Sequence, residues 1–237
     1  MARRAAAVTA AAVTAAALAV SGCAGGSSSA QPNEPPGGRV PAGTGYTSDQ
    51  LEQALLTEIT GYRRAGQPES GEYGSLRAIR NFSQLQRQVK LNKPECAGAT
   101  RTFDASPDVQ RAPAAISTFA KGFGQFATEA LMTVPDEISE RLVTLRIPAG
   151  CRSFRAKIGD SLSTHQVLAA VRGRLGQGSR TVGVATVTGT SRVRTWYVVL
   201  RSRGYVATVT LYGPDATRTE AEQLARRVYE RAEAVLP

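Results

Sequence analysis

Three cysteines and one histidine are the side chains in this sequence best suited to covalent or acid–base chemistry. They are Cys23, Cys96, Cys151 and His165. A nucleophilic catalyst needs a base held in place by a carboxylate, and Asp160 is the nearest acidic residue before His165. No Gly-x-Ser-x-Gly elbow accompanies this pair. We therefore predict no catalytic residue, and the chain is not expected to be an enzyme.

Cys23 follows a segment with the layout of a secretory signal. Arg3 and Arg4 precede an uncharged, alanine-rich stretch over residues 5–20, and two small residues come directly before the cysteine. A basic start, an apolar centre and a small-residue cleavage site are typical of an exported protein. A transmembrane helix is a weaker interpretation, because a span needs about 20 strongly apolar residues.

The run Leu18-Ala19-Val20-Ser21-Gly22-Cys23 resembles the signal of bacterial lipoproteins, with Val20 where leucine is commoner. The resemblance implies a signal peptide over residues 1–22, a diacylglyceryl group on the thiol and a mature chain that starts at Cys23. Two or more acyl chains, palmitate among them, would anchor the protein stably to the extracytoplasmic face of the cell membrane. The alternative is a secreted protein with a chance cysteine at this position.

Cys96 and Cys151 remain as a pair once Cys23 is acylated. In an oxidising compartment such a pair is most simply a disulfide, although two free thiols are the alternative. Closing this loop would stabilise the fold by roughly 4 kcal/mol. With a single histidine and no Cys/His cluster, we expect no metal site.

The charge balance is strongly basic, with 29 Lys and Arg against 19 Asp and Glu. Loss of a leader carrying two arginines lowers the formal net charge from +10 to +8. Such a surface favours anionic lipid or acidic polymers, or it simply keeps the protein soluble. We predict no nucleic acid partner for an exported chain without an aromatic-interleaved basic motif, and no cofactor.

The chain divides into a tether and one folded domain. Residues 23–46 are rich in Gly, Ser and Pro and predict a disordered tether. Residues 47–237 are predicted to form a single domain, with helical spacing over 47–62, 76–89, 136–145 and 219–235. The last helix carries a capping-box pattern in Thr219 and Glu222.

Strand patterns fill the rest of the domain, most clearly at 193–200 and 205–212. Further strands are predicted at 123–133, 153–158 and 181–188. Residues 163–174 are assigned to a strand although they also fit a helix, and residues 114–119 fit either. The resulting fold class is α+β, a largely antiparallel twisted sheet packed by helices, including a C-terminal helix.

Trp196, Arg192 and Arg194 are the candidate ligand-binding residues on one strand. Alternation places these three on one face and Arg201 and Arg203 on the other. The arginines could form an anion site, or they could be solvated strand ends. The only tryptophan of the chain could be a ligand platform or a core residue.

Four short runs carry a second resemblance, over residues 47–236. They are Pro94-Glu95-Cys96, Pro148-Ala149-Gly150-Cys151-Arg152-Ser153-Phe154, Leu175-Gly176-Gln177-Gly178-Ser179-Arg180, and Arg203-Gly204-Tyr205-Val206 followed by Gly213-Pro214 and an alanine-rich helix. The chain resembles the extracellular sensor domain of actinobacterial serine/threonine receptor kinases and the lipoproteins that share it. The resemblance implies an α+β fold with a cleft for a small ligand and no catalytic residues. Kinase-linked members have two disulfides, whereas this chain can form only one.

These features together predict a lipid-anchored, non-catalytic protein of the cell envelope that acts as a ligand-binding or sensor module. Its expected partners are the membrane, a small-molecule or lipid ligand and an envelope protein. The alternative is a structural or adhesive protein that holds anionic lipid or acidic polymer through its basic surface.

Overall fold

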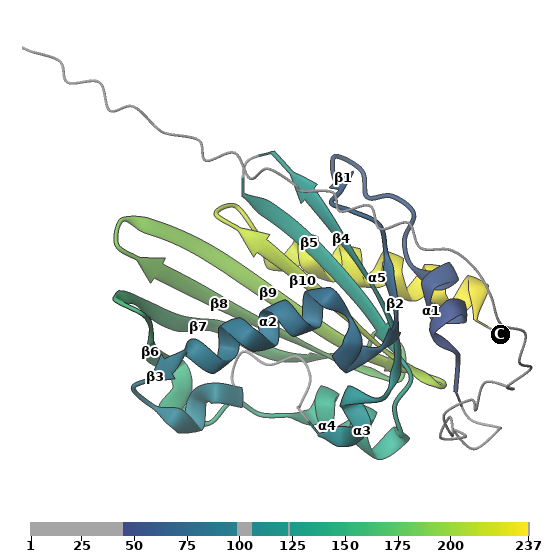
Figure 1. Ribbon diagram of the computed structural model, residues 1–237, viewed down its shortest axis with the longest axis horizontal. Coiled ribbons are helices and arrows are strands. Elements are labelled where there is room, and N and C mark those ends of the chain that lie inside the picture. The colour runs from purple at the N-terminus through teal and green to yellow at the C-terminus, as the bar shows by residue number, and fades with distance from the viewer. Residues whose placement is uncertain (1–44, 99–105, 123, 237) are drawn as a thin grey trace, which may run out of the picture. The chain divides into compact units, whose positions relative to one another are not determined.

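A computed structural model describes residues 45–98, 106–122 and 124–236 (Figure 1). Residues 41–237 form one unit. The predicted leader, Cys23 and nearly all of the predicted tether lie outside the described residues.

Within the described residues, one antiparallel sheet of ten strands organises this unit. The spatial order is β1-β4-β5-β10-β9-β8-β7-β6-β3, and β2 pairs with β4 beside β1. The strands are β1 (Arg63–Arg64), β2 (Glu69–Glu72), β3 (Lys90–Leu91), β4 (Pro113–Lys121), β5 (Gln125–Met132), β6 (Ser153–Ile158), β7 (Ser161–Gly173), β8 (Gly178–Thr188), β9 (Ser191–Ser202) and β10 (Tyr205–Gly213).

The β-branched and alternating segments of the sequence produce this sheet. Strands β6 to β10 follow one another as a meander, and the β4–β5 hairpin joins it along β10. The two ambiguous segments are both strands, β4 and β7. Strand β7 contains an irregularity between Val167 and Ala169, which shifts its register against β8.

Five α-helices and three short 3₁₀-helices surround the sheet in the described residues. They are α1 (Ser48–Ala54), η1 (Tyr73–Ser75), α2 (Arg77–Gln88), η2 (Pro94–Gly98), α3 (Pro107–Gln110), α4 (Asp136–Thr144), η3 (Ala149–Arg152) and α5 (Arg218–Val235). The α+β prediction, including the C-terminal helix, is confirmed.

The end of helix α1 and the N-terminal cap of helix α5 differ from those predicted. Helix α1 ends at Ala54 instead of continuing to residue 62, because the Leu56 N–H donates to Oε1 of the Glu129 carboxyl group on β5 at 2.8 Å. Helix α5 begins at Arg218 and is capped by Thr217, whose hydroxyl accepts from the Glu220 N–H. The predicted cap at Thr219 is thus wrong by two residues.

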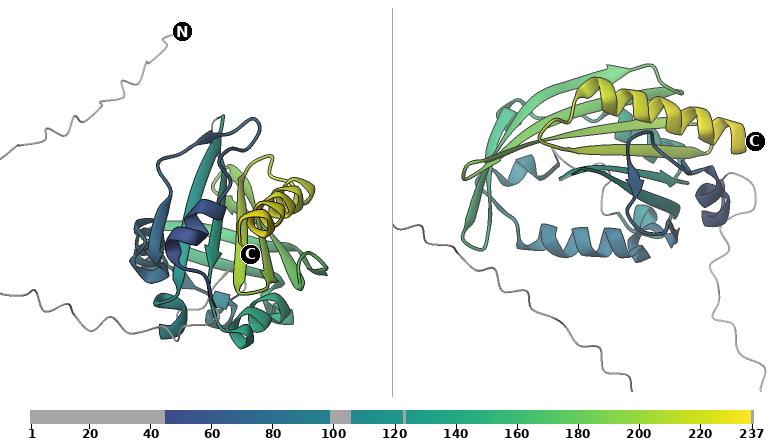
Figure 2. Two further views of the ribbon diagram at one scale, coloured as in Figure 1. Left: turned by 90° about the vertical axis from the view of Figure 1, so that its right-hand side faces the viewer. Right: turned by 90° about the horizontal axis from the view of Figure 1, so that it is seen from above.

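Each face of the sheet carries its own core. Helices α1 and α5 cover one face, with Leu51, Phe119, Leu131, Leu211 and Val228 among its buried residues. On the other face, Val109 of α3 and Leu142 of α4 share a core with Met132 and Val206 of the sheet. Helix α2 runs along the same side (Figure 2). Period-two alternation explains the division, because Val206 and Ala207 point to opposite cores.

A third, small cluster surrounds the disulfide between Cys96 and Cys151. Both cysteines are fully buried, and Phe154 of β6 packs against them. The bond ties η2 to η3 at the β3–β6 end of the sheet. The predicted disulfide is confirmed.

Candidate functional site

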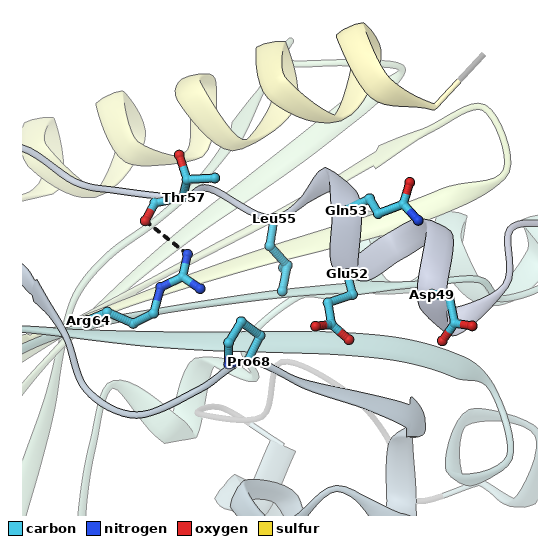
Figure 3. Close-up of a pocket in the computed structure, with 7 residues that line it drawn as sticks. All are labelled: Asp49, Glu52, Gln53, Leu55, Thr57, Arg64 and Pro68. Carbon is cyan, nitrogen blue, oxygen red and sulfur yellow. Dashed lines mark hydrogen bonds between the residues drawn. The ribbon is translucent and has the colours of Figure 1, made fainter.

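A cavity of about 480 Å³ lies between α1 and the segments that follow it (Figure 3). The Thr47 capping box starts α1 at Ser48, so that residues 49, 52 and 53 fall within its two turns. The chain then returns through β1 and β2, which pair with β4. The lining residues are Asp49, Glu52, Gln53, Leu55, Thr57, Arg64 and Pro68.

Arg64 forms a fixed wall of this cavity. Its Nη2 donates to the carbonyl oxygens of Leu56 at 2.8 Å and Thr57 at 2.9 Å. The guanidinium lies 5.5 Å from the centre of the Phe119 ring, a cation–π contact that holds it against the core. The charge of Arg64 is therefore held at one end of the cavity.

Asp49 and Glu52 place two carboxylates on the opposite wall, both from α1 (Figure 3). Glu52 also accepts a hydrogen bond from the Ser70 hydroxyl of β2. A small polar molecule could turn an amine toward these carboxylates and an acceptor toward Arg64 or the Gln53 amide. The lining thus combines two carboxylates, one amide and one guanidinium, which are groups suited to hydrogen bonding and ion pairing.

Glu129 of β5, which is linked through Leu56 to Arg64, is a carboxyl group buried in the core, with 2% of its surface exposed. Its Oε1 accepts from Leu56, the residue whose carbonyl holds Arg64. Within the described residues, Oε2 and the Ser117 hydroxyl opposite it on β4 have no hydrogen-bond partner. Burial raises the pKa of Glu129 to about 8, and the Leu56 N–H, Arg64 and Arg227 oppose that rise.

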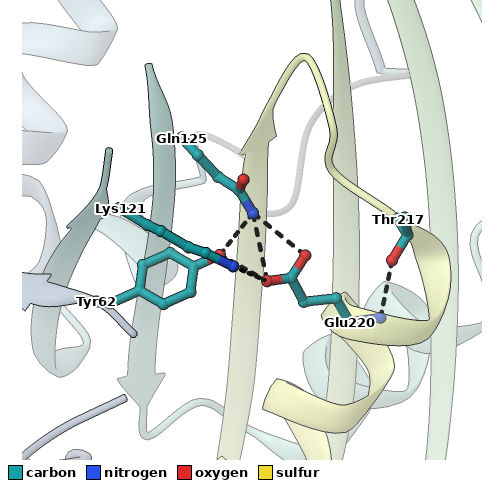
Figure 4. Close-up of polar contacts among 5 residues, drawn as sticks. All are labelled: Tyr62, Lys121, Gln125, Thr217 and Glu220. Carbon is teal, nitrogen blue, oxygen red and sulfur yellow. Dashed lines mark hydrogen bonds and ion pairs between the residues drawn. The ribbon is translucent and has the colours of Figure 1, made fainter. Parts of the chain in front are cut away.

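A polar cluster joins the segment after α1 to the start of α5 (Figure 4). Tyr62 Oη donates to Glu220 at 2.8 Å, and Gln125 Nε2 donates to Tyr62 Oη at 2.7 Å. Lys121 Nζ lies 3.8 Å from the same carboxylate. Burial and the neighbouring Glu220 raise the pKa of Tyr62, so its phenol stays protonated and holds the two segments together.

His165 lies on β7, away from this cavity, in a setting of hydroxyl groups. Ser163 Oγ is 2.9 Å from its Nε2 and Thr186 Oγ1 is 3.0 Å from its Nδ1. The ring stacks on Phe154 at 5.0 Å, and burial lowers the pKa of the imidazole. A threonine thus occupies the place where a catalytic triad requires a carboxylate.

The three residues predicted for ligand binding share β9 but do not line the cavity. Trp196 is buried in the core under α5, and its Nε1 donates to the Ala216 carbonyl at 3.1 Å. Arg192 is exposed and Arg194 is half-buried. The sequence gives no signal that Arg64 lies near Asp49 and Glu52. The pairing of β1 and β2 with β4 brings these residues together, and that pairing is not visible in a local pattern.

Comparison with solved structures finds a similar fold. The chain resembles the extracellular domain of PknH from Mycobacterium tuberculosis. That likeness has a TM-score of 0.56 at 12% identity and covers 81% of this chain and 98% of the other. A putative uncharacterized protein from Mycobacterium smegmatis matches with a TM-score of 0.47 at 17% identity, over 78% of this chain and 97% of that one.

No family model and no curated protein matches the sequence. In the part of the chain that the structure describes, none of the helices is both long and apolar enough to span a membrane. Over the same residues, no three His, Cys, Asp or Glu side chains gather as metal ligands. The match to the extracellular domain of PknH confirms the fold expected from the resemblance to receptor-kinase sensor domains.

Proposed function

We propose that this protein is a lipid-anchored, non-catalytic module of the cell envelope that binds a small polar ligand in the cavity beside Arg64. The observation that carries the proposal is the fold, which follows a kinase extracellular domain over nearly the whole of that domain. The hydroxyl environment of His165 supports a binding role over a catalytic one.

The lipid anchor depends on Cys23. Cells that express the full chain are labelled with an alkyne analogue of palmitate and then fractionated. We expect label and membrane association in the wild type and loss of both in Cys23→Ser. The control is the double variant Cys96→Ala/Cys151→Ala, which should keep its label; a Cys23→Ser chain that remains labelled would refute the anchor.

The ligand site depends on the fixed guanidinium of Arg64. Native mass spectrometry of the full chain, purified from its own cell envelope, should detect a bound small molecule that Arg64→Met loses. Arg63→Met is the matched control, because Arg63 is the exposed neighbour on β1 and does not line the cavity. Equal retention in both variants would exclude this cavity, and a hydrolytic activity abolished by His165→Ala would exclude a non-catalytic protein.

The basic surface supports a second candidate, a structural or adhesive protein that holds anionic lipid or acidic polymer. Arg192 of β9 and Arg155 of β6 are among the exposed arginines. Binding to anionic vesicles by the Cys23→Ser chain should then fall steeply as salt rises. Binding that does not change with salt would count against this candidate.

A further inference from the structure

Three arginine side chains from neighbouring strands meet on the sheet face that carries α4. Arg172 of β7 stands directly opposite Arg180 of β8, and Arg201 of β9 stands opposite Gly178. Cross-strand partners share a face, and Arg180 pairs with Val199, which lies in the core under α4. Arg201 follows Val199 by two residues and therefore points to the same side.

Arg180 is the most unusual of the three, because only 4% of its surface is exposed. Its Nη1 donates to the Leu145 carbonyl at 3.4 Å, and its buried Nε has no partner among the described residues. A buried charge without a carboxylate is costly, and an apolar side chain of similar volume would often be more stable. Packing alone does not explain an arginine at this position.

The end of α4 offsets only part of this charge. Arg172 Nη2 donates to the Thr144 carbonyl at 3.3 Å, and the last carbonyls of a helix carry about half a negative charge. The buried Nε of Arg201 has no partner within the described residues. Of the carboxylates in those residues, none forms an ion pair with Arg172, Arg180 or Arg201.

A cavity of about 220 Å³ has Arg172 and Arg201 in its lining, whereas Arg180, on the strand between theirs, is buried and does not line it. It is lined by Glu140, Val143, Thr144, Arg172, Gly173, Gln177, Gly178, Ser179 and Arg201. Arg180 lies between two of the lining residues, Ser179 in its own strand and Arg172 in the next. Glu140 is the single carboxylate of the lining.

The turn between β7 and β8 fixes the position of Arg201. The Gln177 N–H donates to the Arg201 carbonyl at 2.9 Å. Gly176 has a φ of +61°, and a Cβ there would lie 2.4 Å from that carbonyl oxygen, so only glycine fits. The end of β9 is thereby held in place beside the cavity.

We infer that this arginine pocket, formed by Arg172, Arg180, Arg201 and the cavity they adjoin, binds a phosphate group. The two lining arginines and the buried Arg180 beside them, against the one carboxylate of Glu140, leave an excess of two positive charges, which matches a phosphate dianion. Guanidinium forks bind phosphate oxygens in pairs. The site goes beyond the proposed function, because it lies on the opposite sheet face from Arg64 and does not depend on that cavity.

Calorimetric titration of inorganic phosphate into the full chain, purified in detergent and buffered in chloride, tests the site. We expect saturable binding that Arg201→Gln weakens by about tenfold or more. Arg203→Gln is the matched control, since Arg203 is exposed in the next turn, and it should stay within about twofold of wild type. Absence of saturable binding, or an equal loss in both variants, would overturn the inference.

Arg180→Met separates ligand binding from folding. Removing a buried charge should raise the thermal midpoint without phosphate by about 2–4 °C. Phosphate should raise the midpoint of wild type but not of this variant. An Arg180→Met chain that is destabilised, yet still gains stability from phosphate as wild type does, would contradict the site.

Competition against phosphate then identifies the source of the group. Displacement by glycerol phosphate indicates a free phosphate monoester, whereas displacement only by phosphatidic acid vesicles, and not by phosphatidylcholine vesicles, indicates a lipid headgroup. Both outcomes support a phosphate site. Failure of both compounds to compete would overturn the assignment of the ligand class.

Discussion

The Glu129 carboxyl group connects the cavity beside Arg64 with the core. It holds the Leu56 N–H where α1 ends, and its second oxygen has no partner among the described residues. Its unfolded-state pKa is the ordinary 4.5, whereas burial raises the folded value to about 8. Because the native protein binds this proton more tightly, stability falls as pH rises from about 4.5 to about 8 and is level above that.

Glu129→Gln should remove this pH dependence, because the amide stays neutral and its oxygen can still accept from Leu56. We expect the variant to match wild type near pH 5 and to exceed it near pH 9 by roughly 3–5 kcal/mol as an upper bound. Urea unfolding at the two pH values measures the difference. Glu137→Gln, an exposed residue of α4, is the control that should behave as wild type at both.

Gly183 is the residue that leaves room for Trp196. The two stand opposite each other on β8 and β9, and a Cβ on Gly183 would lie 2.4 Å from the indole ring. We expect Gly183→Ala to lower the free energy of unfolding by about 1–3 kcal/mol through overpacking. The control is Gly150→Ala, where a Cβ meets nothing within 4 Å; equal urea midpoints for the two variants would contradict this.

At the scale of elements, α5 depends on its cap. Thr217 accepts from the Glu220 N–H, whereas Thr219 lies one residue inside the helix. Thr217→Ala should cost about 1 kcal/mol of unfolding free energy. Thermal unfolding of Thr219→Ala provides the comparison, and a larger loss there would favour the cap predicted from sequence.

The disulfide is the second element-scale test. Cys96→Ala/Cys151→Ala should lose roughly 4 kcal/mol of unfolding free energy, because the open chain regains loop entropy. Wild type under reducing conditions should lose a similar amount. Cys23→Ser should unfold at the wild-type urea concentration in the absence of reductant, and a matching loss there would mean that Cys23 takes part in the bond.

Local patterns predicted the elements well where each strand carries its own signal. The alternation in β9 and β10 and the apolar face of α5 were sufficient to predict these elements, because their apolar residues are buried in the core. The end of α1 was not predictable, since it depends on a hydrogen bond from Leu56 to the Glu129 carboxyl group, 73 residues further along the chain.

Neither pocket could be predicted from local sequence patterns, because the lining residues of each come from several elements. Alternation correctly placed Arg201 on the face opposite Trp196, but its companions come from other strands. Arg172 meets Arg180 only because β7 shifts register between Val167 and Ala169. A side-chain pattern within one strand contains no information about such a shift in its pairing.

At the scale of the whole molecule, the first and last helices depend on each other. Arg231 Nη2 donates to the Gln53 carbonyl at 3.1 Å and Arg227 Nη2 to the Glu58 carbonyl at 3.2 Å. Leu51 and Ile59 are buried in the core that α5 covers. The segment from α1 to Tyr62 is thus part of the folded domain and not of the tether.

Truncation tests this boundary. Removal of residues 1–44 should leave the urea midpoint unchanged, whereas removal of residues 1–62 should expose the core under α5 and give an unfolded or aggregated chain. Circular dichroism and size-exclusion chromatography distinguish the two. A soluble, cooperatively folded chain that begins at residue 63 would show that α1 is dispensable.

At the β3 edge of the sheet, side chains as well as strand β3 form hydrogen bonds with the backbone at β6. Asn92 Oδ1 accepts from the Arg155 N–H, and Lys93 Nζ donates to the carbonyls of Gly150 and Ser153. These side chains occupy three backbone groups, beyond the two residues of β6 that β3 pairs, which could otherwise pair with a strand from a second copy. Each backbone group occupied in this way is one fewer available for the intermolecular strand pairing from which aggregates grow.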